Sequence, residues 1–131
     1  MNYIADQDFG KVSYREKPLA KGEYENCRFR DCDFSECNLS DFVFTDCKFI
    51  YCNLSLVKLT GVDFSECDLT GSFFTDCDLD GAVFDNTNLE KADFSTAFNY
   101  SIDPERNKFK RTRFSSGGLK GLLNKYDIII V

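Results

Sequence analysis

Large apolar side chains recur at every fifth position over most of this sequence. From Gly22 the chain divides into fifteen consecutive five-residue units, and the third residue of every unit is Phe, Leu or Tyr. These third residues are Tyr24, Phe29, Phe34, Leu39, Phe44, Phe49, Leu54, Leu59, Phe64, Leu69, Phe74, Leu79, Phe84, Leu89 and Phe94. The first residue of a unit is mostly small, and the other three are mostly polar. One short period kept over so many units indicates a repeat architecture.

A period of five fits neither the 3.6-residue period of an α-helix nor the two-residue period of a strand. It does fit a chain that turns a corner every five residues, so that four units close a square coil of about twenty residues and successive coils stack about 4.8 Å apart. The third and first residues of each unit then point inward, and the others face water. A single unit cannot bury its apolar pair, so the fold depends on stacking.

The fifteen units resemble the pentapeptide-repeat family, whose pattern is A(D/N)LXX. This resemblance implies an all-β fold, a right-handed quadrilateral β-helix. Phe42 departs from the pattern because it fills a position that is mostly small. We expect the coil to bulge or repack around it.

The two ends of the chain break the regular run, and they predict three segments. Residues 1–21 are expected to form an N-terminal cap and a partial coil, with residues 7–15 in the five-residue phase. Residues 22–116 are expected to form the β-helix. Asn99 and Pro104 fall where large apolar residues belong, so an irregular loop is predicted at about 99–107. Residues 117–131 are expected to form a short helix and a terminal strand.

The C-terminal segment predicts either a cap or a dimer interface. Ser115 and Ser116 are suited to cap a helix, and the apolar residues that follow have helical spacing and then form a β-branched run. The candidate interface comprises Leu119, Leu122, Leu123, Tyr126, Ile128, Ile129, Ile130 and Val131. The segment could simply cover the last coil of a monomer. It also resembles the end of the quinolone-resistance branch of the family, which implies a homodimer, and four consecutive apolar residues favour that interpretation.

Seven cysteines occupy the small inward position of their units. They are Cys27, Cys32, Cys37, Cys47, Cys52, Cys67 and Cys77. Metal binding, disulfides and a nucleophilic role are the alternatives to a simple packing role. The chain has no His and no CxxC spacing, so we interpret the cysteines as small buried hydrophobic residues and expect no metal or other cofactor.

Charge is uneven around the predicted coil, although the whole chain carries a net charge of -6. One face holds six acidic residues and no Lys or Arg. These candidate partner-binding residues are Glu23, Glu25, Asp46, Asp63, Glu66 and Asp85. A solvated surface that keeps the solenoid soluble explains them, and so does an acidic surface that imitates the charge of DNA.

Two further stretches are candidate surfaces. Ile50, Tyr51, Leu56 and Phe73 fall at outward positions around one corner, as a possible apolar patch. The stretch 106–113 is rich in Lys and Arg. We interpret it as a solvated or intramolecular charge patch, and expect no direct binding to nucleic acid.

The sequence favours a non-catalytic binding protein. The N-terminus lacks a signal-peptide pattern and no apolar run could cross a bilayer, so we expect a cytoplasmic protein that does not bind membranes. A filled solenoid is expected to leave no concave pocket for catalysis. The resemblance implies DNA gyrase or topoisomerase IV as the partner of a DNA-mimicking protein. The alternative is a protein–protein interaction scaffold with another partner.

Overall fold

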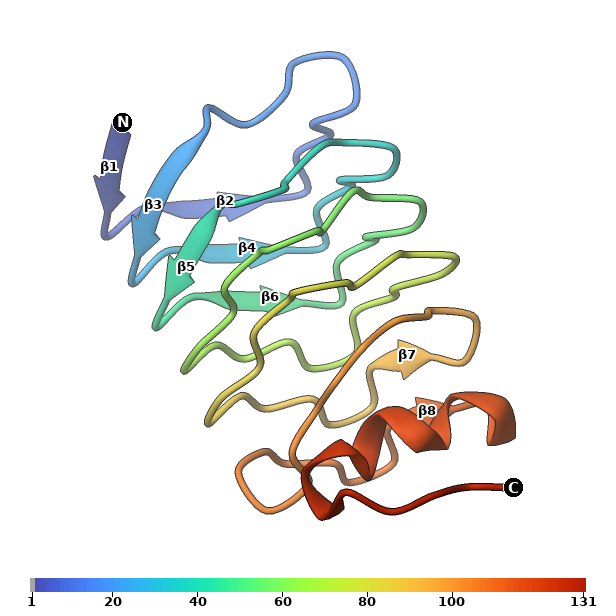
Figure 1. Cartoon of the computed structure of the whole chain (residues 1–131). Coiled ribbons are helices and arrows are strands. Elements are labelled where there is room, and N and C mark those ends of the chain that lie inside the picture. The colour runs from blue at the N-terminus through green and yellow to red at the C-terminus, as the bar shows by residue number, and fades with distance from the viewer. Residues whose placement is uncertain (1) are drawn as a thin grey trace.

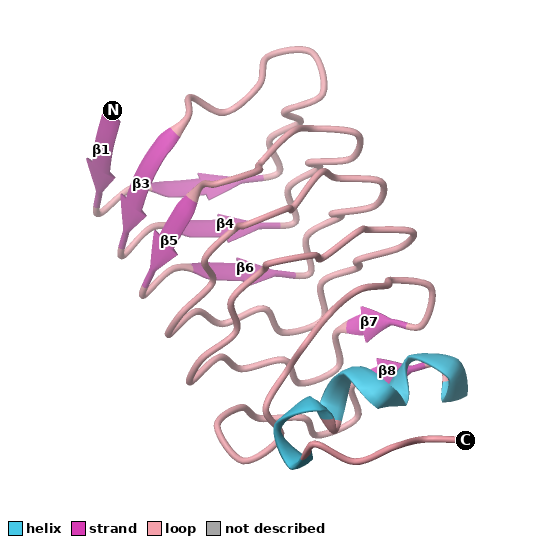
Figure 2. Ribbon diagram, viewed as in Figure 1, coloured by secondary structure: helices cyan, strands magenta, loops and turns pink. Residues whose placement is uncertain are grey.

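The computed structural model describes residues 2–131, which form a β-solenoid of about six turns (Figure 1). The coils are stacked along one axis, and the helical segment near the C-terminus lies across the last coil (Figure 2). The strands are β1 (Asn2–Ala5), β2 (Asp8–Gly10), β3 (Gly22–Glu25), β4 (Arg28–Arg30), β5 (Val43–Thr45), β6 (Lys48–Ile50), β7 (Asp93–Phe94) and β8 (Arg113–Phe114). Two 3₁₀ helices follow, η1 (Ser116–Leu122) and η2 (Asn124–Tyr126).

All strand pairs are parallel and are offset by one coil. The sheets have the orders β1-β3-β5, β2-β4-β6 and β7-β8. Tyr24 is in register with Phe44, and Phe29 with Phe49. Isolated bridges with the same offset, such as Asp63 with Val83, continue the stacking where no strand is assigned. The prediction of a right-handed quadrilateral β-helix is confirmed.

The interior is filled by the residues at every fifth position. All fifteen third-position side chains from Tyr24 to Phe94 are buried. Their rings stack from coil to coil, with centroids 4.7 Å apart for Phe29 and Phe49 and 4.6 Å for Phe74 and Phe94. Burying one such side chain contributes about 1.5–3 kcal/mol, so this column is the main source of stability.

Phe42 is accommodated by repacking and not by a bulge. Its buried ring stacks on Tyr24 of the preceding coil, with centroids 6.2 Å apart, and also contacts Phe44. The register of the next residue is unchanged, since Val43 still pairs with Glu23. The coil therefore keeps its regular path around a large side chain.

The corners require a left-handed backbone. The fifth residue of a unit lies at each corner. Along the regular coils its φ is between 52° and 72°, for example 60° at Glu66 and 67° at Gly71. At many corners a backbone hydrogen bond closes the turn, as from Cys67 N to Phe64 O at 3.2 Å. This is the geometry of a type II turn, which glycine, Asn and Asp adopt most easily.

The first coil begins earlier than the predicted stretch 7–15. β1 pairs with β3 from Asn2 onward, and Ile4 lies in register with Tyr24. Ile4, Phe9 and Leu19 are partly buried against the core. Their numbers keep the five-residue phase, so residues 2–21 form a coil whose outer edge lacks the strand neighbour that the inner coils have.

The last coil differs from the prediction in detail. Where Asn99 interrupts the phase, the neighbouring Tyr100 is buried instead, and Ile102 also enters the core. The expected C-terminal strand does not form. Residues 128–131 have no regular secondary structure and are exposed, and no strand within residues 2–131 pairs with them.

Candidate binding surfaces

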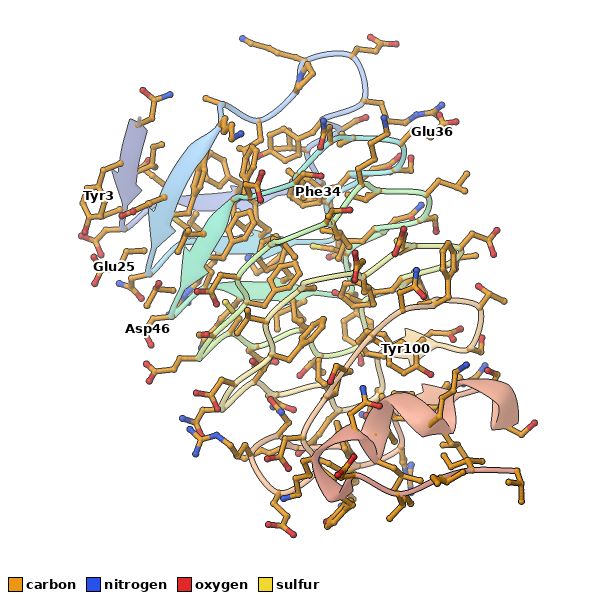
Figure 3. The ribbon with its side chains drawn as sticks, in the orientation of Figure 1. Tyr3, Glu25, Phe34, Glu36, Asp46 and Tyr100 are labelled. Atoms are coloured by element: carbon orange, nitrogen blue, oxygen red, sulfur yellow. The ribbon has the colours of Figure 1, made fainter. Side chains whose placement is uncertain are left out.

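The six acidic residues of the predicted face lie on the outside of the solenoid, on the side formed by β1, β3 and β5 and its continuation. Glu23, Glu25, Asp46 and Glu66 are exposed, whereas Asp63 and Asp85 are half-buried. Figure 3 shows Glu25 and Asp46 at this outer edge, with Tyr3 beside Glu25.

Three of these carboxylates have partners within the chain. Asp63 accepts hydrogen bonds from the backbone N–H and the hydroxyl of Ser65, at 2.9 and 2.6 Å. Tyr3 donates a hydrogen bond to Glu25. Such bonds assign Asp63 and Glu25 a role in local structure, in addition to their charge.

Asp85 is neutralised by Arg106 of the next coil. The guanidinium donates two hydrogen bonds to the carboxylate, at 2.5 and 3.0 Å, and it lowers the pKa of Asp85. The sequence placed these residues in different patches. Their separation of 21 residues, about one coil, was the signal that could have paired them.

The acidic residues without a partner form a smaller set. No hydrogen bond or ion pair within residues 2–131 involves the side chains of Glu23, Asp46 or Glu66. Asp46 and Glu66 occupy the same corner in successive coils, with φ of 53° and 60°, so they are about 4.8 Å apart along the axis. The solenoid thus displays a short acidic surface, defined by Glu23, Asp46 and Glu66.

The predicted apolar patch is divided between two corners. Tyr51 is 51% and Phe73 46% exposed, and Ile50 is half-buried beside Tyr51. Leu56 is 54% exposed but lies at the following corner, five residues after Tyr51. A Cβ added at Gly71 would overlap the Tyr51 ring, so this ring lies along the corner, over the next coil.

The C-terminal segment is partly bound to its own last coil. Ser115 caps η1 as predicted, accepting a hydrogen bond from Gly118 N at 3.1 Å. Gly121 is buried, and its carbonyl accepts a hydrogen bond from Ile102 N at 2.9 Å. A Cβ at Gly118 or Gly121 would overlap Tyr100. The glycines that weaken this helix in isolation therefore allow it to approach the core.

Polar contacts hold η2 as well. Lys125 forms ion pairs with Asp103 at 3.0 Å and Glu105 at 2.8 Å, and the Tyr126 hydroxyl donates to Glu105. Asn124 donates to Ser101 at 2.9 Å. Contacts with the segment 101–105 thus hold η2 in place.

Not all of the predicted dimer residues are available to a partner. Leu122 packs against the core, and Leu123 is half-buried. Leu119 and Tyr126 are 45% and 47% exposed. The most exposed members are the four that end the chain, Ile128, Ile129, Ile130 and Val131.

A groove lies between η1 and the preceding coil, where no concave pocket was expected. It has a volume of about 880 Å³ and is lined in part by Val83, Phe98 and Lys120. The groove arises because the helix crosses the end of the solenoid instead of continuing the coil. Two polar side chains of its lining, Ser115 and Asp103, are occupied by the helix cap and by Lys125.

All seven cysteines are buried free thiols. Several donate to a backbone carbonyl of the preceding coil, as Cys67 does to Phe44 at 2.9 Å. Thr87 continues that column with a hydroxyl bond to Phe64 O at 2.8 Å. Burial raises the pKa of Cys77 to about 11, which disfavours its thiolate, whereas a hydrogen bond with Cys52 lowers the pKa of Cys32. All seven side chains are buried, and they pack as small core residues with a weak donor.

Residues 2–131 contain no group of three or more Cys, Asp or Glu side chains arranged to hold a metal ion. In the same range, no helix has the length and apolar character needed to cross a membrane.

The coil period, the filled interior and the outward charges define a solenoid of five-residue repeats. The sequence profile described as "Pentapeptide repeat region" matches residues 17–94, more than half of the chain. This chain belongs to the pentapeptide-repeat family. A comparison with curated protein sequences gives no significant match.

Solved structures share this fold. A pentapeptide repeat protein from the Arabidopsis thaliana thylakoid lumen has a TM-score of 0.56 and 24% identity, over 76% of this chain and 70% of that chain. QnrB1, a plasmid-mediated fluoroquinolone resistance protein, has a TM-score of 0.50 and 16% identity, over 95% of this chain and 100% of that chain. At these identities the similarity concerns the fold.

Proposed function

We propose that this protein is a non-catalytic binding protein that presents its acidic surface to a DNA-binding enzyme, with a type II topoisomerase as the partner to test first. The observation that carries the proposal is the set Glu23, Asp46 and Glu66, which are exposed and have no partner within residues 2–131. Asp46 and Glu66 at one-coil spacing, with Glu23 on the adjoining side one coil earlier, offer a Lys- and Arg-lined groove negative charge on a rigid rod, as a phosphate backbone does.

The resemblance to QnrB1 supports the choice of enzyme. That protein is described as a fluoroquinolone resistance protein, and fluoroquinolones act on DNA gyrase and topoisomerase IV. The present rod is short. About six coils at 4.8 Å each give a stack of about 24–29 Å, so an end-to-end dimer of about 50–60 Å would match roughly 15–18 base pairs.

A homodimer through the C-terminal segment is part of the proposal. Ile129 is 89% exposed, and Ile128 and Ile130 are 55% and 57% exposed. A two-fold contact would remove these side chains from water and place the two rods end to end. We expect Ile129→Asp with Ile130→Asp to yield a monomer by light scattering that keeps the circular dichroism spectrum of the folded chain, since neither side chain contributes to the core.

The acidic surface is tested with DNA gyrase in a supercoiling assay. The triple variant Glu23→Lys, Asp46→Lys and Glu66→Lys is expected to raise the half-inhibitory concentration at least tenfold, an estimate of about 1.4 kcal/mol for three reversed charges. Lysine should be tolerated, since Lys48 holds the same position within its unit as Glu23, five units further along, and Lys91 occupies a corner equivalent to that of Glu66.

The matched control reverses three exposed corner acids on other sides of the coil, Asp31→Lys, Asp41→Lys and Asp76→Lys. It changes the net charge equally and should retain inhibition. Equal loss in both variants would show that overall charge, not this surface, is responsible. If the wild-type protein is a folded dimer but does not inhibit supercoiling at about 50 µM, its dissociation constant lies above that concentration. This result would eliminate topoisomerase binding and favour a scaffold with another partner.

A further inference from the structure

Five basic side chains of the last two coils have no intramolecular acidic partner. They are Lys91, Lys108, Lys110, Arg111 and Arg113, all exposed. Within residues 2–131, none of them forms an ion pair within 4.0 Å. Arg106 and Lys125, by contrast, are paired with Asp85 and Asp103. The predicted intramolecular role of the basic stretch thus holds for Arg106 only.

The five side chains surround one corner of the solenoid. Lys91 and Arg111 occupy this corner in successive coils, with φ of 61° and 59°, and Lys91 N donates to Lys110 O at 3.0 Å. Lys108 precedes the corner on one side and Arg113 follows it on the other, in register with Asp93. Two coils therefore present these cations as one patch.

The exposed aromatic side chains continue the same corner. Tyr51, Gly71, Lys91 and Arg111 are each twenty residues apart, and the Tyr51 ring lies over Gly71 toward Lys91. On the adjoining side, Phe73 bridges to Asp93, the residue above Arg113. Part of the predicted apolar patch and the predicted basic stretch thus form one strip.

We call this strip the cationic–aromatic stripe. It consists of Tyr51, Phe73, Lys91, Lys108, Lys110, Arg111 and Arg113. From Tyr51 to Arg111 it spans three coil steps, or about 14 Å, which is the length of four or five residues of extended chain. One end is half-exposed aromatic surface and the other is unpaired positive charge.

We propose that the cationic–aromatic stripe binds a short acidic segment of another protein, in which a large apolar residue adjoins a run of Asp or Glu. The Asp or Glu residues of the segment would pair with Lys91 and Arg111 through charge complementarity. Its apolar residue would pack on the rings of Tyr51 and Phe73. This surface is distinct from the acidic surface, so the protein would join two partners of opposite charge.

A short segment fits better than a long polyanion. Asp31 lies at the same corner one coil before Tyr51, and Asp68 and Glu90 border the stripe on one side. A nucleic acid or an anionic bilayer, charged along its whole length, would approach these carboxylates and the net charge of -6. A segment of four or five residues along the corner is short enough to avoid Asp31. Glu90 is half-buried beside Lys91, and Asp93 is half-buried and accepts two hydrogen bonds from Ser95.

The test measures fluorescence anisotropy of a labelled peptide, Leu-Leu-Glu-Glu-Glu-Glu, at low ionic strength, where the Debye length is long. We expect saturable binding below about 1 mM. The double variant Lys91→Glu with Arg111→Glu should raise the dissociation constant of the peptide at least about tenfold, because two attractive charges become repulsive. Phe73→Ser should weaken it severalfold but leave the binding of hexaglutamate unchanged. Glu36 and Glu66 show that glutamate is accommodated at such corners.

The control is Lys11→Glu with Lys21→Glu, which makes the same charge change on the first coil. Lys11 occupies the same corner as Lys91, with φ of 57°, so it matches Lys91 in backbone geometry. Lys21, which is also exposed, supplies the second charge change. Peptide binding retained by this control supports the stripe. Equal weakening by both variants, no saturation at about 1 mM, or tighter binding to phosphatidylserine vesicles or a single-stranded oligonucleotide would each overturn the proposal.

Discussion

The regular coils and the last coil of this solenoid are stabilised in different ways. From Tyr24 to Phe94 every fifth side chain is buried, and each coil repeats the contacts of the one before. From Tyr100 onward the order of residues changes, and specific contacts replace the repeat: glycines against Tyr100 and ion pairs of Lys125. A repeated column makes stability a sum of similar terms, whereas the end of a solenoid depends on individual contacts.

The largest expected effect is the loss of a ring from the regular column. Phe64→Ala should lower the free energy of unfolding by about 3–5 kcal/mol, because the side chain is fully buried and its cavity cannot collapse between stacked coils. Chemical denaturation measures this change. The equivalent substitution in the last coil, Phe109→Ala, should cost clearly less, since Phe109 is only half-buried. Equal costs would remove the distinction between the two regions.

The next effect concerns the contact between η1 and Tyr100. Gly121→Ala should destabilise the end of the solenoid by about 1–3 kcal/mol, because the new methyl group overlaps the Tyr100 carbonyl. Gly117→Ala is the matched control on the same helix, where a Cβ meets nothing within 4 Å. It should be neutral or slightly stabilising. Thermal unfolding of both variants, compared with the wild type, decides whether close approach fixes the helix.

A smaller effect is expected within the regular coils. Thr87→Val removes the hydroxyl that donates to Phe64 O at 2.8 Å but keeps the shape of the side chain. The loss of this bond should cost about 0.5–1.5 kcal/mol in chemical denaturation, because the Phe64 carbonyl keeps its hydrogen bond from Cys67 N. Thr60→Val, on an exposed side chain, serves as the control. A neutral Thr87→Val would mean that the inward donors act by size alone.

The smallest effect should depend on pH. Lys125 lowers the pKa of Glu105, and the backbone N–H of Glu105 with Lys125 lowers that of Asp103. Their ionised forms therefore stabilise the fold above the ordinary values of 3.8 and 4.5, and this stabilisation is lost as pH falls through the lower folded values. Lys125→Ala should reduce the melting temperature at pH 7, and the difference should shrink below about pH 4. Lys120→Ala, which removes no ion pair, should show no such dependence.

The sequence predicted the fold where one residue type repeats in one phase. Fifteen units in phase are enough to determine the coil length, the inward column and the burial of the cysteines. The first coil was underestimated because Ile4 and Leu19 also keep the phase but lie beyond the uninterrupted run. Phe42 did not produce a bulge, since ring stacking on Tyr24 absorbed its volume.

The surfaces were less predictable, because they depend on which residues of neighbouring coils meet. The Arg106–Asp85 pair reduces the predicted acidic face, and Leu56 proved to lie at a different corner from Tyr51. The groove beside η1 follows from the crossing of the helix, which no five-residue pattern encodes. The terminal residues 128–131 have strand propensity but no strand to pair with, and propensity alone does not form a strand.

Native-state hydrogen exchange, resolved by residue, shows whether the column from Tyr24 to Phe94 forms the stable unit and the last coil is held separately. We expect amides bonded between regular coils, such as those of Phe49 and Leu69, to exchange only through global unfolding. Amides such as those of Ile102 and Leu123 should exchange through a smaller opening. Uniform protection across both regions, or faster exchange in the regular coils, would contradict this division.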